Sequence, residues 1–198
     1  MKQRHNKLVT QIHKKKRKEL GIEDNSFVVG HVGRFADVKN HLFLLDVFIE
    51  ISLSRPSAEL LLVGDGELRS KIEEKAAELR LKNKVIFTGD RSDVNELMMV
   101  MDVFVFPSKY EGLPVTLVEA QCSGLPCLVS DMIPSDSILI KELVQVCSLQ
   151  DPASDWADAA LQCRNENRIA CAEKIKEAGF DIEKNAKWLE EFYFEKTK

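Results

Sequence analysis

Two glutamates with seven residues between them, Glu111 and Glu119, form the most informative spacing in this chain. Glu111 falls in a polar loop at 108–112, and Glu119 lies about a turn and a half inside a helix predicted to start near Pro114 and stop at Gly124. The free N–H groups of a helix start carry about half a positive charge and bind phosphate well. Two carboxylates beside such a site favour a ligand with hydroxyls on both sides of a phosphate, such as a sugar and a ribose.

A second group of residues that suit an anion follows the first predicted strand. Gly33, Arg34 and Lys39 lie between a β-rich run at 27–33 and a helical pattern at 41–54. Open α/β sheets bind their ligands at the carboxyl ends of strands. Arginine offers phosphate a rigid fork of donors, and lysine offers a point charge. The pattern indicates an anion site, and the alternative is a pair of solvated loop cations.

Two further turns lie at the ends of predicted strands. Gly64, Asp65 and Gly66 lack the third glycine of a dinucleotide-binding G-x-G-x-x-G, so they are interpreted as a tight turn near the ligand. Asp90 and Arg91 follow the third strand, where Arg91 is either a ligand contact or a solvated turn residue. Two histidines flank the same region, but no role is assigned to His31 or His41, since a lone histidine more often packs than reacts.

Strand and helix patterns alternate along the chain. Strands are predicted at 27–33, 58–64, 84–89, 103–106 and 144–149, with another beginning at Pro126. Helices are predicted at 41–54, 67–81, 94–101, 114–124, 151–164, 166–178 and 181–195, with Asp93 capping the third. Trp156 and Trp188 are expected to pack helices against the sheet. The alternation predicts an α/β fold, a Rossmann-like parallel sheet with helices on both faces.

The segment around the two glutamates resembles the E-x7-E motif of retaining glycosyltransferases with two Rossmann-like domains. This is the GT-B architecture, and the likeness is to family four, the group 1 enzymes. Glu-Gly-Leu-Pro stands where members often have Glu-Gly-Phe-Gly, and the run Glu-Ala-Gln-Cys-Ser-Gly-Leu-Pro after it is also similar. The resemblance implies one half of a GT-B fold, the C-terminal donor-binding half. It divides the chain into a linker with a basic helix at 1–24, a nucleotide-sugar-binding domain at 25–180 and a crossover helix at 181–198.

The resemblance also assigns roles to single residues. Arg34 and Lys39 would hold the donor diphosphate, Glu111 the hydroxyls of the transferred sugar, and Glu119 the ribose, while Pro114 removes one N–H where the family often has glycine. The implied catalytic residues are Glu111, Arg34 and Lys39. The implied donor-binding residues are Gly33, Arg34, Lys39, Gly64, Asp90, Arg91, Glu111, Gly112, Leu113, Pro114, Val115, Thr116 and Glu119.

The activity that this resemblance implies is glycosyl transfer with retention, from a nucleoside-diphosphate sugar to a saccharide or lipid-linked acceptor. Family members commonly work in bacterial cell-surface polysaccharide or exopolysaccharide synthesis. No cofactor is expected, and no metal, because Arg34 and Lys39 would stabilise the leaving group and the sequence has no Asp-x-Asp motif. The acceptor is expected on an N-terminal domain outside this chain. This half alone is therefore expected to bind the donor with little or no transfer.

Three other classes of protein share this architecture. A nucleotide-sugar epimerase remains an alternative, and a glycogen-type phosphorylase would need a lysine for pyridoxal phosphate, of which there is no clear motif. A non-enzymatic doubly wound module, such as a receiver domain, would carry acids at the end of the first strand, where Arg34 stands. A P-loop nucleotidase is excluded because G-x-x-x-x-G-K-[ST] is missing.

Composition agrees with a globular domain. The 198 residues are 44% apolar and 30% charged, and the net charge of −4 gives no reason to expect nucleic acid as a partner. Five cysteines without a C-x-x-C pair indicate free thiols in a reducing cytoplasm. Five consecutive basic residues, 14–18, indicate either a solvated helix or contact with anionic lipid at the inner membrane face.

Overall fold

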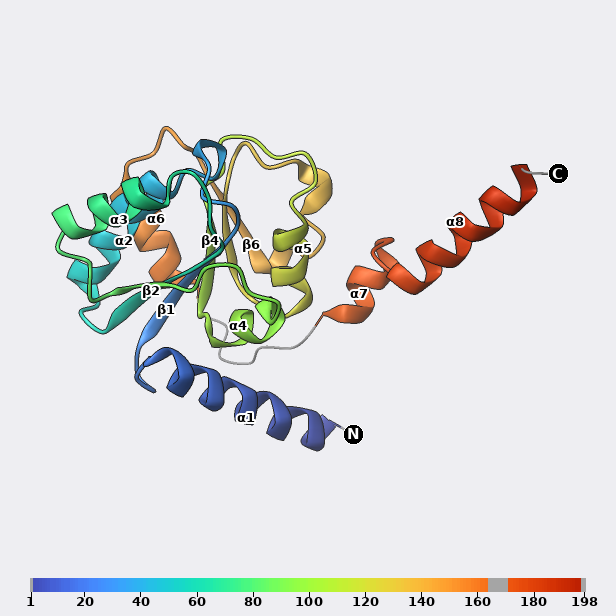
Figure 1. Ribbon diagram of the computed structural model, residues 1–198, viewed down its shortest axis with the longest axis horizontal. Helices are drawn as coiled ribbons and strands as arrows, with labels where there is room; N and C mark the ends of the chain where they lie inside the picture. The colour runs from blue at the N-terminus through green and yellow to red at the C-terminus, as the bar shows by residue number, and fades with distance from the viewer. Residues whose placement is uncertain (1, 164–170, 197–198) are drawn as a thin grey trace.

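Six parallel strands form the centre of the computed structural model, which describes residues 2–163 and 171–196 (Figure 1). The strands are β1 (Phe27–Val32), β2 (Ala58–Val63), β3 (Val85–Phe87), β4 (Val103–Phe106), β5 (Cys127–Ser130) and β6 (Val144–Cys147). Their spatial order is β3-β2-β1-β4-β5-β6, and every neighbouring pair is parallel. This arrangement confirms the predicted Rossmann-like α/β fold.

Helices cover both faces of the sheet (Figure 1). One face carries α2 (His41–Ser54), α3 (Arg69–Glu78) and α6 (Ala153–Gln162), and the other carries α1 (Lys2–Leu20), α4 (Val94–Val100) and α5 (Val115–Cys122). The α7 helix (Ala172–Glu177) packs beside α5, and α8 (Ile182–Lys196) follows it. Short 3-10 turns are η1 (Asp37–Lys39), η2 (Ser135–Ser137) and η3 (Lys141–Leu143).

Neighbouring residues of β1 belong to different hydrophobic cores. Val29 packs in the core that contains Phe48 and Trp156, whereas Val28 packs in the core that contains Leu97 and Phe104. All six residues of β1 are buried. A strand covered on both faces needs apolar residues at successive positions, which explains why the pattern of β1 is nearly continuous rather than alternating.

The helix α8 projects away from the sheet, at the right of Figure 1. Trp188 is 61% exposed, and its ring stacks on Phe192 of the same helix with 5.5 Å between the ring centroids. Trp156, in contrast, is fully buried in α6, and its Nε1–H donates to the Ser148 carbonyl at 2.9 Å. The prediction that both tryptophans pack helices against the sheet is thus confirmed for Trp156 and wrong for Trp188. The amphipathic pattern of a helix shows that it has an apolar face but not which surface that face contacts.

Several predicted boundaries differ from the structure. The predicted helix at 67–81 is shorter at both ends, because the Leu68 N–H bonds to the Phe35 carbonyl and Arg80 has a positive φ of 58°. Asp93 does occupy the position before α4, but its carboxylate makes no cap because Arg91 and Lys16 bind it. The first part of the helix predicted at 166–178 lies outside the described residues, which resume with Cys171 and then α7.

The basic N-terminal segment is helical, as predicted, and α1 packs against α4. The five consecutive basic residues divide between two environments, since Lys16 and Arg17 are buried while Lys14, Lys15 and Lys18 are exposed. In residues 2–163 and 171–196, no helix has both the length and the apolar character that crossing a membrane requires.

The turn after β2 depends on Gly64. Its φ is +127°, and a Cβ at this position would overlap the carbonyl oxygen of Gly33. The Gly64 N–H also bonds to the Gly89 carbonyl at 2.9 Å, which ties the ends of β2 and β3 together. Three loops at the carboxyl edge of the sheet therefore meet around one residue that has no side chain.

We expect Gly64→Ala to lower the free energy of unfolding by about 2 kcal/mol or more, because alanine meets both a strained φ and a steric overlap there. Urea unfolding followed by circular dichroism measures this change. The control is Gly112→Ala, where an added Cβ has no neighbour within 4 Å, and we expect a change below about 0.5 kcal/mol. Equal effects of the two substitutions would contradict this account of the turn.

Candidate functional site

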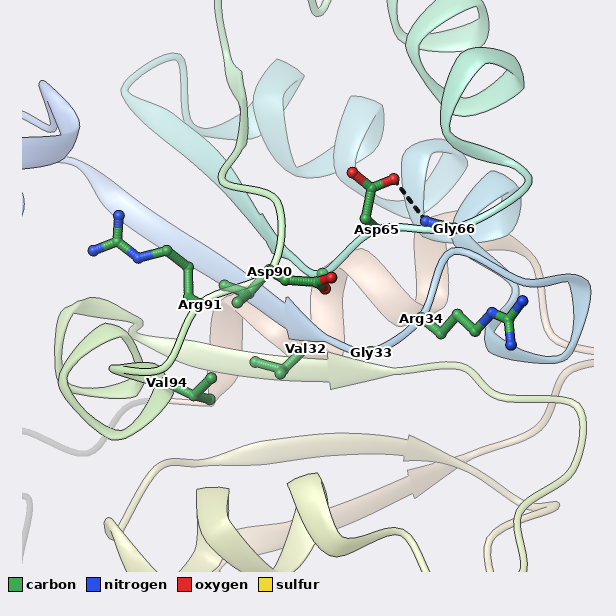
Figure 2. Close-up of a pocket in the computed structure, with 10 residues that line it drawn as sticks. Val32, Gly33, Arg34, Asp65, Gly66, Asp90, Arg91 and Val94 are labelled. Atoms are coloured by element: carbon green, nitrogen blue, oxygen red, sulfur yellow. Dashed lines mark hydrogen bonds between the residues drawn. The ribbon is translucent and has the colours of Figure 1, made fainter.

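The ends of β1, β2 and β3 enclose a pocket of about 560 Å³. Its lining, drawn in Figure 2, consists of Val32, Gly33, Arg34, Val63, Gly64, Asp65, Gly66, Asp90, Arg91 and Val94. Five of the predicted donor-binding residues line it, namely Gly33, Arg34, Gly64, Asp90 and Arg91. The sequence analysis did not assign Val32, Val63 or Val94 to the site, because single valines at strand ends look like core residues.

The two cations of this pocket do not face each other. Figure 2 shows the side chains of Arg34 and Arg91 at opposite ends of the pocket, directed away from one another, with Asp90 between them. Arg34 is 75% exposed by its side chain and pairs with Glu67, at 3.3 Å between Nη2 and Oε2. Arg91 bonds to Asp93 and to Glu19 of α1, each at 2.7 Å. The guanidinium groups of both arginines therefore already have acidic partners.

Lys39 and Glu111, predicted from separate segments, form a direct ion pair. Lys39 Nζ lies 2.7 Å from Glu111 Oε1, and the two side chains are only 16% and 11% exposed. The ammonium also lies 4.8 Å from the centre of the Phe106 ring. Lys39 reaches back over the first turn as well, since a Cβ placed on Gly33 would be 3.3 Å from Lys39 Cε. The residues predicted to bind the diphosphate and the transferred sugar, Lys39 and Glu111, are therefore in direct contact.

The loop that carries Glu111 is fastened to η1 beside this pair. The Lys109 N–H donates to the Val38 carbonyl at 2.8 Å, and Lys109 Nζ bonds to both carboxylate oxygens of Asp37 at 2.9 Å. Lys109 thereby takes Asp37 as its partner and leaves Glu111 to Lys39. Lys109 stands only two positions from Glu111 in the same loop, yet its described ion pair is with Asp37.

The helix start after Glu111 is confirmed near Pro114, which is the residue before α5. Three N–H groups of the first turn are already used, since Val115 donates to the Leu113 carbonyl, and Leu117 and Val118 donate to Pro114. Among the described backbone bonds, the N–H groups of Gly112, Leu113 and Thr116 have no acceptor. These three remain as donors for an anion, fewer than an unobstructed helix start would offer.

Glu119 lies on the exposed side of α5 and, among the described residues, its carboxylate has no ion pair or hydrogen bond. Partial desolvation raises the pKa of this carboxyl group above its usual value. The residues 112–116 and Glu119 belong to the α5 segment and do not line the pocket between β1, β2 and β3. The structure therefore presents the candidate site as two adjoining parts, which Gly33, Lys39 and Glu111 connect.

Two buried histidines lie beneath this connection. The rings of His31 and His41 are 4.5 Å apart, and His31 Nδ1 lies 2.9 Å from the Val105 carbonyl oxygen. A carbonyl only accepts, so Nδ1 carries the proton, and the unprotonated Nε2 would lie 3.4 Å from a Cβ on Gly33. Burial lowers the pKa of His31 well below its usual value, and burial together with Lys39 lowers the pKa of His41 to about 4. Both rings are neutral at pH 7.

Asp65 is a pocket residue whose orientation the sequence analysis did not foresee. Its carboxylate accepts from the Gly66 N–H at 2.7 Å and from Arg69 at 2.8 Å, and these bonds lower its pKa. Arg69 also lies over the Phe87 ring. The spacing of Asp65 and Arg69, four positions apart at a helix start, is a signal that sequence reading can use. In the described part of the chain, no group of three or more potential ligands is arranged to hold a metal ion.

Comparison with known proteins identifies the family of this chain. The model of the glycosyl transferases group 1 family matches residues 12–180. The chain belongs to this family. It is 42% identical over 168 residues to EpsF of Bacillus subtilis (strain 168), which bears a provisional glycosyltransferase name, covering 83% of the chain and 44% of EpsF. It is 30% identical to the Escherichia coli enzyme named UDP-Gal:alpha-D-GlcNAc-diphosphoundecaprenol alpha-1,3-galactosyltransferase, covering 91% of the chain and 48% of that enzyme.

Solved structures of this architecture share the fold. Anabaena Alr3699/HepE, in complex with UDP-glucose, matches with a TM-score of 0.74 at 23% identity, over 93% of this chain and 53% of that one. WaaG, a glycosyltransferase involved in lipopolysaccharide biosynthesis, matches with a TM-score of 0.71 at 24% identity, over 86% of this chain and 47% of that one. These likenesses confirm the GT-B type of fold. The chain spans about half the length of each of these two relatives and two solved structures.

The neutral histidines generate a prediction about pH. A histidine whose pKa is lower in the folded state than in the unfolded state, near 6.5, binds fewer protons when folded. Stability is therefore fully present above pH 6.5 and falls as the pH drops toward about 4. We expect each neutral histidine to contribute a slope of up to about 1.4 kcal/mol per pH unit in this window.

The measurement is urea unfolding of the parent chain and of His41→Gln at several values between pH 7 and pH 4. We expect the variant to be less stable at pH 7 but to lose less of its stability on acidification. The carboxylates titrate in both proteins, so their contribution to the pH dependence cancels when the two slopes are compared. Parallel curves for the two proteins would show that His41 is not held neutral by the fold.

Proposed function

We propose that this chain binds the nucleotide-sugar donor of a retaining glycosyltransferase, and that the donor is a UDP-sugar. The full enzyme would transfer that sugar to a saccharide or lipid-linked acceptor in cell-surface polysaccharide synthesis. Family membership supports the reaction class, and the E. coli relative is named for a UDP-galactose donor. The single observation that carries the proposal is the largely buried Lys39–Glu111 ion pair, which lies between the pocket and the start of α5. It joins a residue suited to bind an anion to a residue suited to bind hydroxyls.

The roles follow from what each group can bind. The pocket of about 560 Å³ is within the range of small-molecule sites and is assigned to the base, against Asp90, Arg91 and Val94. Arg34 and Lys39 are assigned to the diphosphate, and Glu119 to the ribose hydroxyls. Glu111 is assigned to the hydroxyls of the transferred sugar, because one of its carboxylate oxygens already accepts from Lys39 and the other has no partner among the described bonds.

Lys39 does not need to leave Glu111 when the donor binds. An ammonium group has three N–H donors, of which one is directed to Glu111, so the others are free to meet phosphate oxygens. Lys39 would then hold the diphosphate and the sugar-binding carboxylate in a fixed relation. As the anomeric bond breaks, negative charge accumulates on the diphosphate, where Arg34, Lys39 and the N–H groups of Gly112, Leu113 and Thr116 stabilise it. In this proposal no metal ion is required.

Substitutions of Lys39 and of Glu111 should affect nucleotide binding in different ways. Lys39→Met should weaken binding of both UDP and the UDP-sugar by about tenfold to a hundredfold, since it removes a charged contact to the diphosphate. Glu111→Gln should change UDP affinity by less than about threefold but remove the preference for UDP-sugar over UDP. Isothermal titration calorimetry with UDP, GDP, ADP, phosphate and UDP-hexoses measures each effect.

The control for these variants is Lys71→Met, which removes an exposed lysine of α3 that does not line the pocket and has no side-chain bond among the described contacts. Its affinities should match the parent chain. Absence of any nucleotide binding by the parent chain would refute the donor-site proposal. A UDP-sugar preference that survives Glu111→Gln would refute the role of Glu111 alone.

We also propose that α1 contacts anionic lipid through Lys14, Lys15 and Lys18, which are exposed, whereas Lys16 and Arg17 face the domain. Each exposed lysine near an anionic surface contributes about 1 kcal/mol of attraction. Replacing the three with glutamine should lower binding to phosphatidylglycerol vesicles by about tenfold or more in a co-sedimentation assay. The matched control replaces exposed Lys71, Lys82 and Lys174. Equal losses in the two triple variants would show that only net charge matters.

A further inference from the structure

Helix α1 is bound to the domain by buried charge. Lys16 is 6% exposed and Arg17 is 3% exposed, which is unusual for basic side chains on a terminal helix. The Arg17 guanidinium donates to the Glu23 carbonyl at 2.9 Å and the Ser26 carbonyl at 3.0 Å, and pairs with Asp102 at 3.2 Å. These bonds anchor the end of α1 to the start of β1 and to the residue before β4.

A second set of charges forms a closed ring between α1 and the loop after β3. Lys16 binds Asp93 and lies 3.1 Å from Glu19. Asp93 binds Arg91 through two 2.7 Å contacts, and Arg91 Nη2 returns to Glu19 Oε1 at 2.7 Å. Lys16 also reaches Glu96 of α4 at 3.1 Å. The ring therefore joins two residues of α1 to two residues that follow β3.

The pKa values follow from this ring. Arg91 first, and then Lys16, lowers the pKa of Asp93 and of Glu19 below their usual values. Three neighbouring carboxylates raise the pKa of the Lys16 ammonium group. Asp93 has the largest effect, followed by Glu96 and then Glu19. All four members are charged at pH 7, so every edge of the ring is an ion pair rather than a neutral hydrogen bond.

The loop in the ring is also a wall of the pocket. Asp90, Arg91 and Val94 line it, and the Gly64–Gly89 backbone bond fixes the start of the loop from the side of β2. In Figure 2 the side chain of Asp90 lies toward the centre of the pocket, while that of Arg91 turns away to the left. Neighbouring residues of the loop thus face opposite directions, one toward the pocket and one toward Glu19 of α1.

From this arrangement we propose that α1 sets the position of the pocket wall, and that Glu19 and Lys16 are positioning residues for nucleotide binding although neither lines the pocket. The inference rests on the proposed donor site. Ion pairs on α1 hold Arg91 and Asp93, and these hold Asp90 and Val94 in place against the nucleotide. Arg17 anchors α1 through bonds outside the ring, so breaking the ring loosens the loop while α1 stays docked.

The test is Glu19→Gln, which removes the charge from the two edges of the ring that Glu19 forms, with Lys16 and with Arg91, and leaves the residues that line the pocket unchanged. We expect UDP to bind about three- to tenfold more weakly, in line with the effect of residues that couple to a ligand without contacting it. The matched control is Glu78→Gln, an exposed glutamate of α3 that belongs to no ion pair described here. Calorimetry on both variants and the parent chain gives the comparison.

A double-mutant cycle with Arg91→Met separates positioning from a general loss of stability. If Glu19 acts through Arg91, the double variant should bind UDP as Arg91→Met alone does. Additive losses, or an unchanged affinity for Glu19→Gln, would overturn the proposal while leaving the donor site intact.

Hydrogen exchange of the ligand-free chain tests the proposal even if UDP does not bind. In Glu19→Gln, the amides of Glu96 and Leu97, which donate to the Asp93 carbonyl, should exchange several times faster than in the parent chain, while those of β1 and β2 stay unchanged. Failure of UDP to bind the parent chain would instead count against the proposed function. Unchanged exchange at Glu96 and Leu97 would show that α1 does not hold this wall of the pocket.

Discussion

Every strand of the sheet runs in the same direction, and the candidate site depends on this constraint. β1, β2, β3 and β4 all end at one edge, so the loops that follow them share a surface although they are distant in sequence. Burial on both faces fixes the strands, because a shift by one residue would exchange the contents of the two cores. Gly64 then allows the loops to approach closely enough to bond to each other. The contact between Lys39 and Glu111 is a consequence of this shared edge.

The sequence predicted the parts of the site that depend on local pattern. Strand patterns, the helix start near Pro114 and the spacing of Glu111 and Glu119 are all short-range features, and the strands and helix start agree with the structure. It did not predict partners. Lys109 is near Glu111 in sequence, yet it forms an ion pair with Asp37. Asp93 was predicted to cap a helix, yet its carboxylate binds Arg91 and Lys16 instead. Side-chain partners are chosen by which loops meet, and no local pattern contains that information.

Each cation at the edge of the sheet has an acidic partner. Arg34 pairs with Glu67, Lys39 with Glu111, and Arg91 with Asp93 and Glu19. The edge is thus not a broad positive surface, in keeping with the net charge of −4 for the chain. In the proposed donor site, recognition of an anion would depend on the direction of individual N–H donors rather than on a long-range field. Such a site would select ligands by shape, because a misplaced anion would meet carboxylates as readily as cations.

The two tryptophans of the chain report on different parts of it. Trp156 is enclosed in the core and bonded to the Ser148 carbonyl, whereas Trp188 stands in solvent on α8. Indole emission shifts to longer wavelength in water, so the spectrum is a sum of a blue component from the sheet and a red component from α8. A soluble quencher such as iodide reaches the second indole and not the first. Fluorescence therefore distinguishes an event that covers α8 from one that loosens the sheet, without any introduced label.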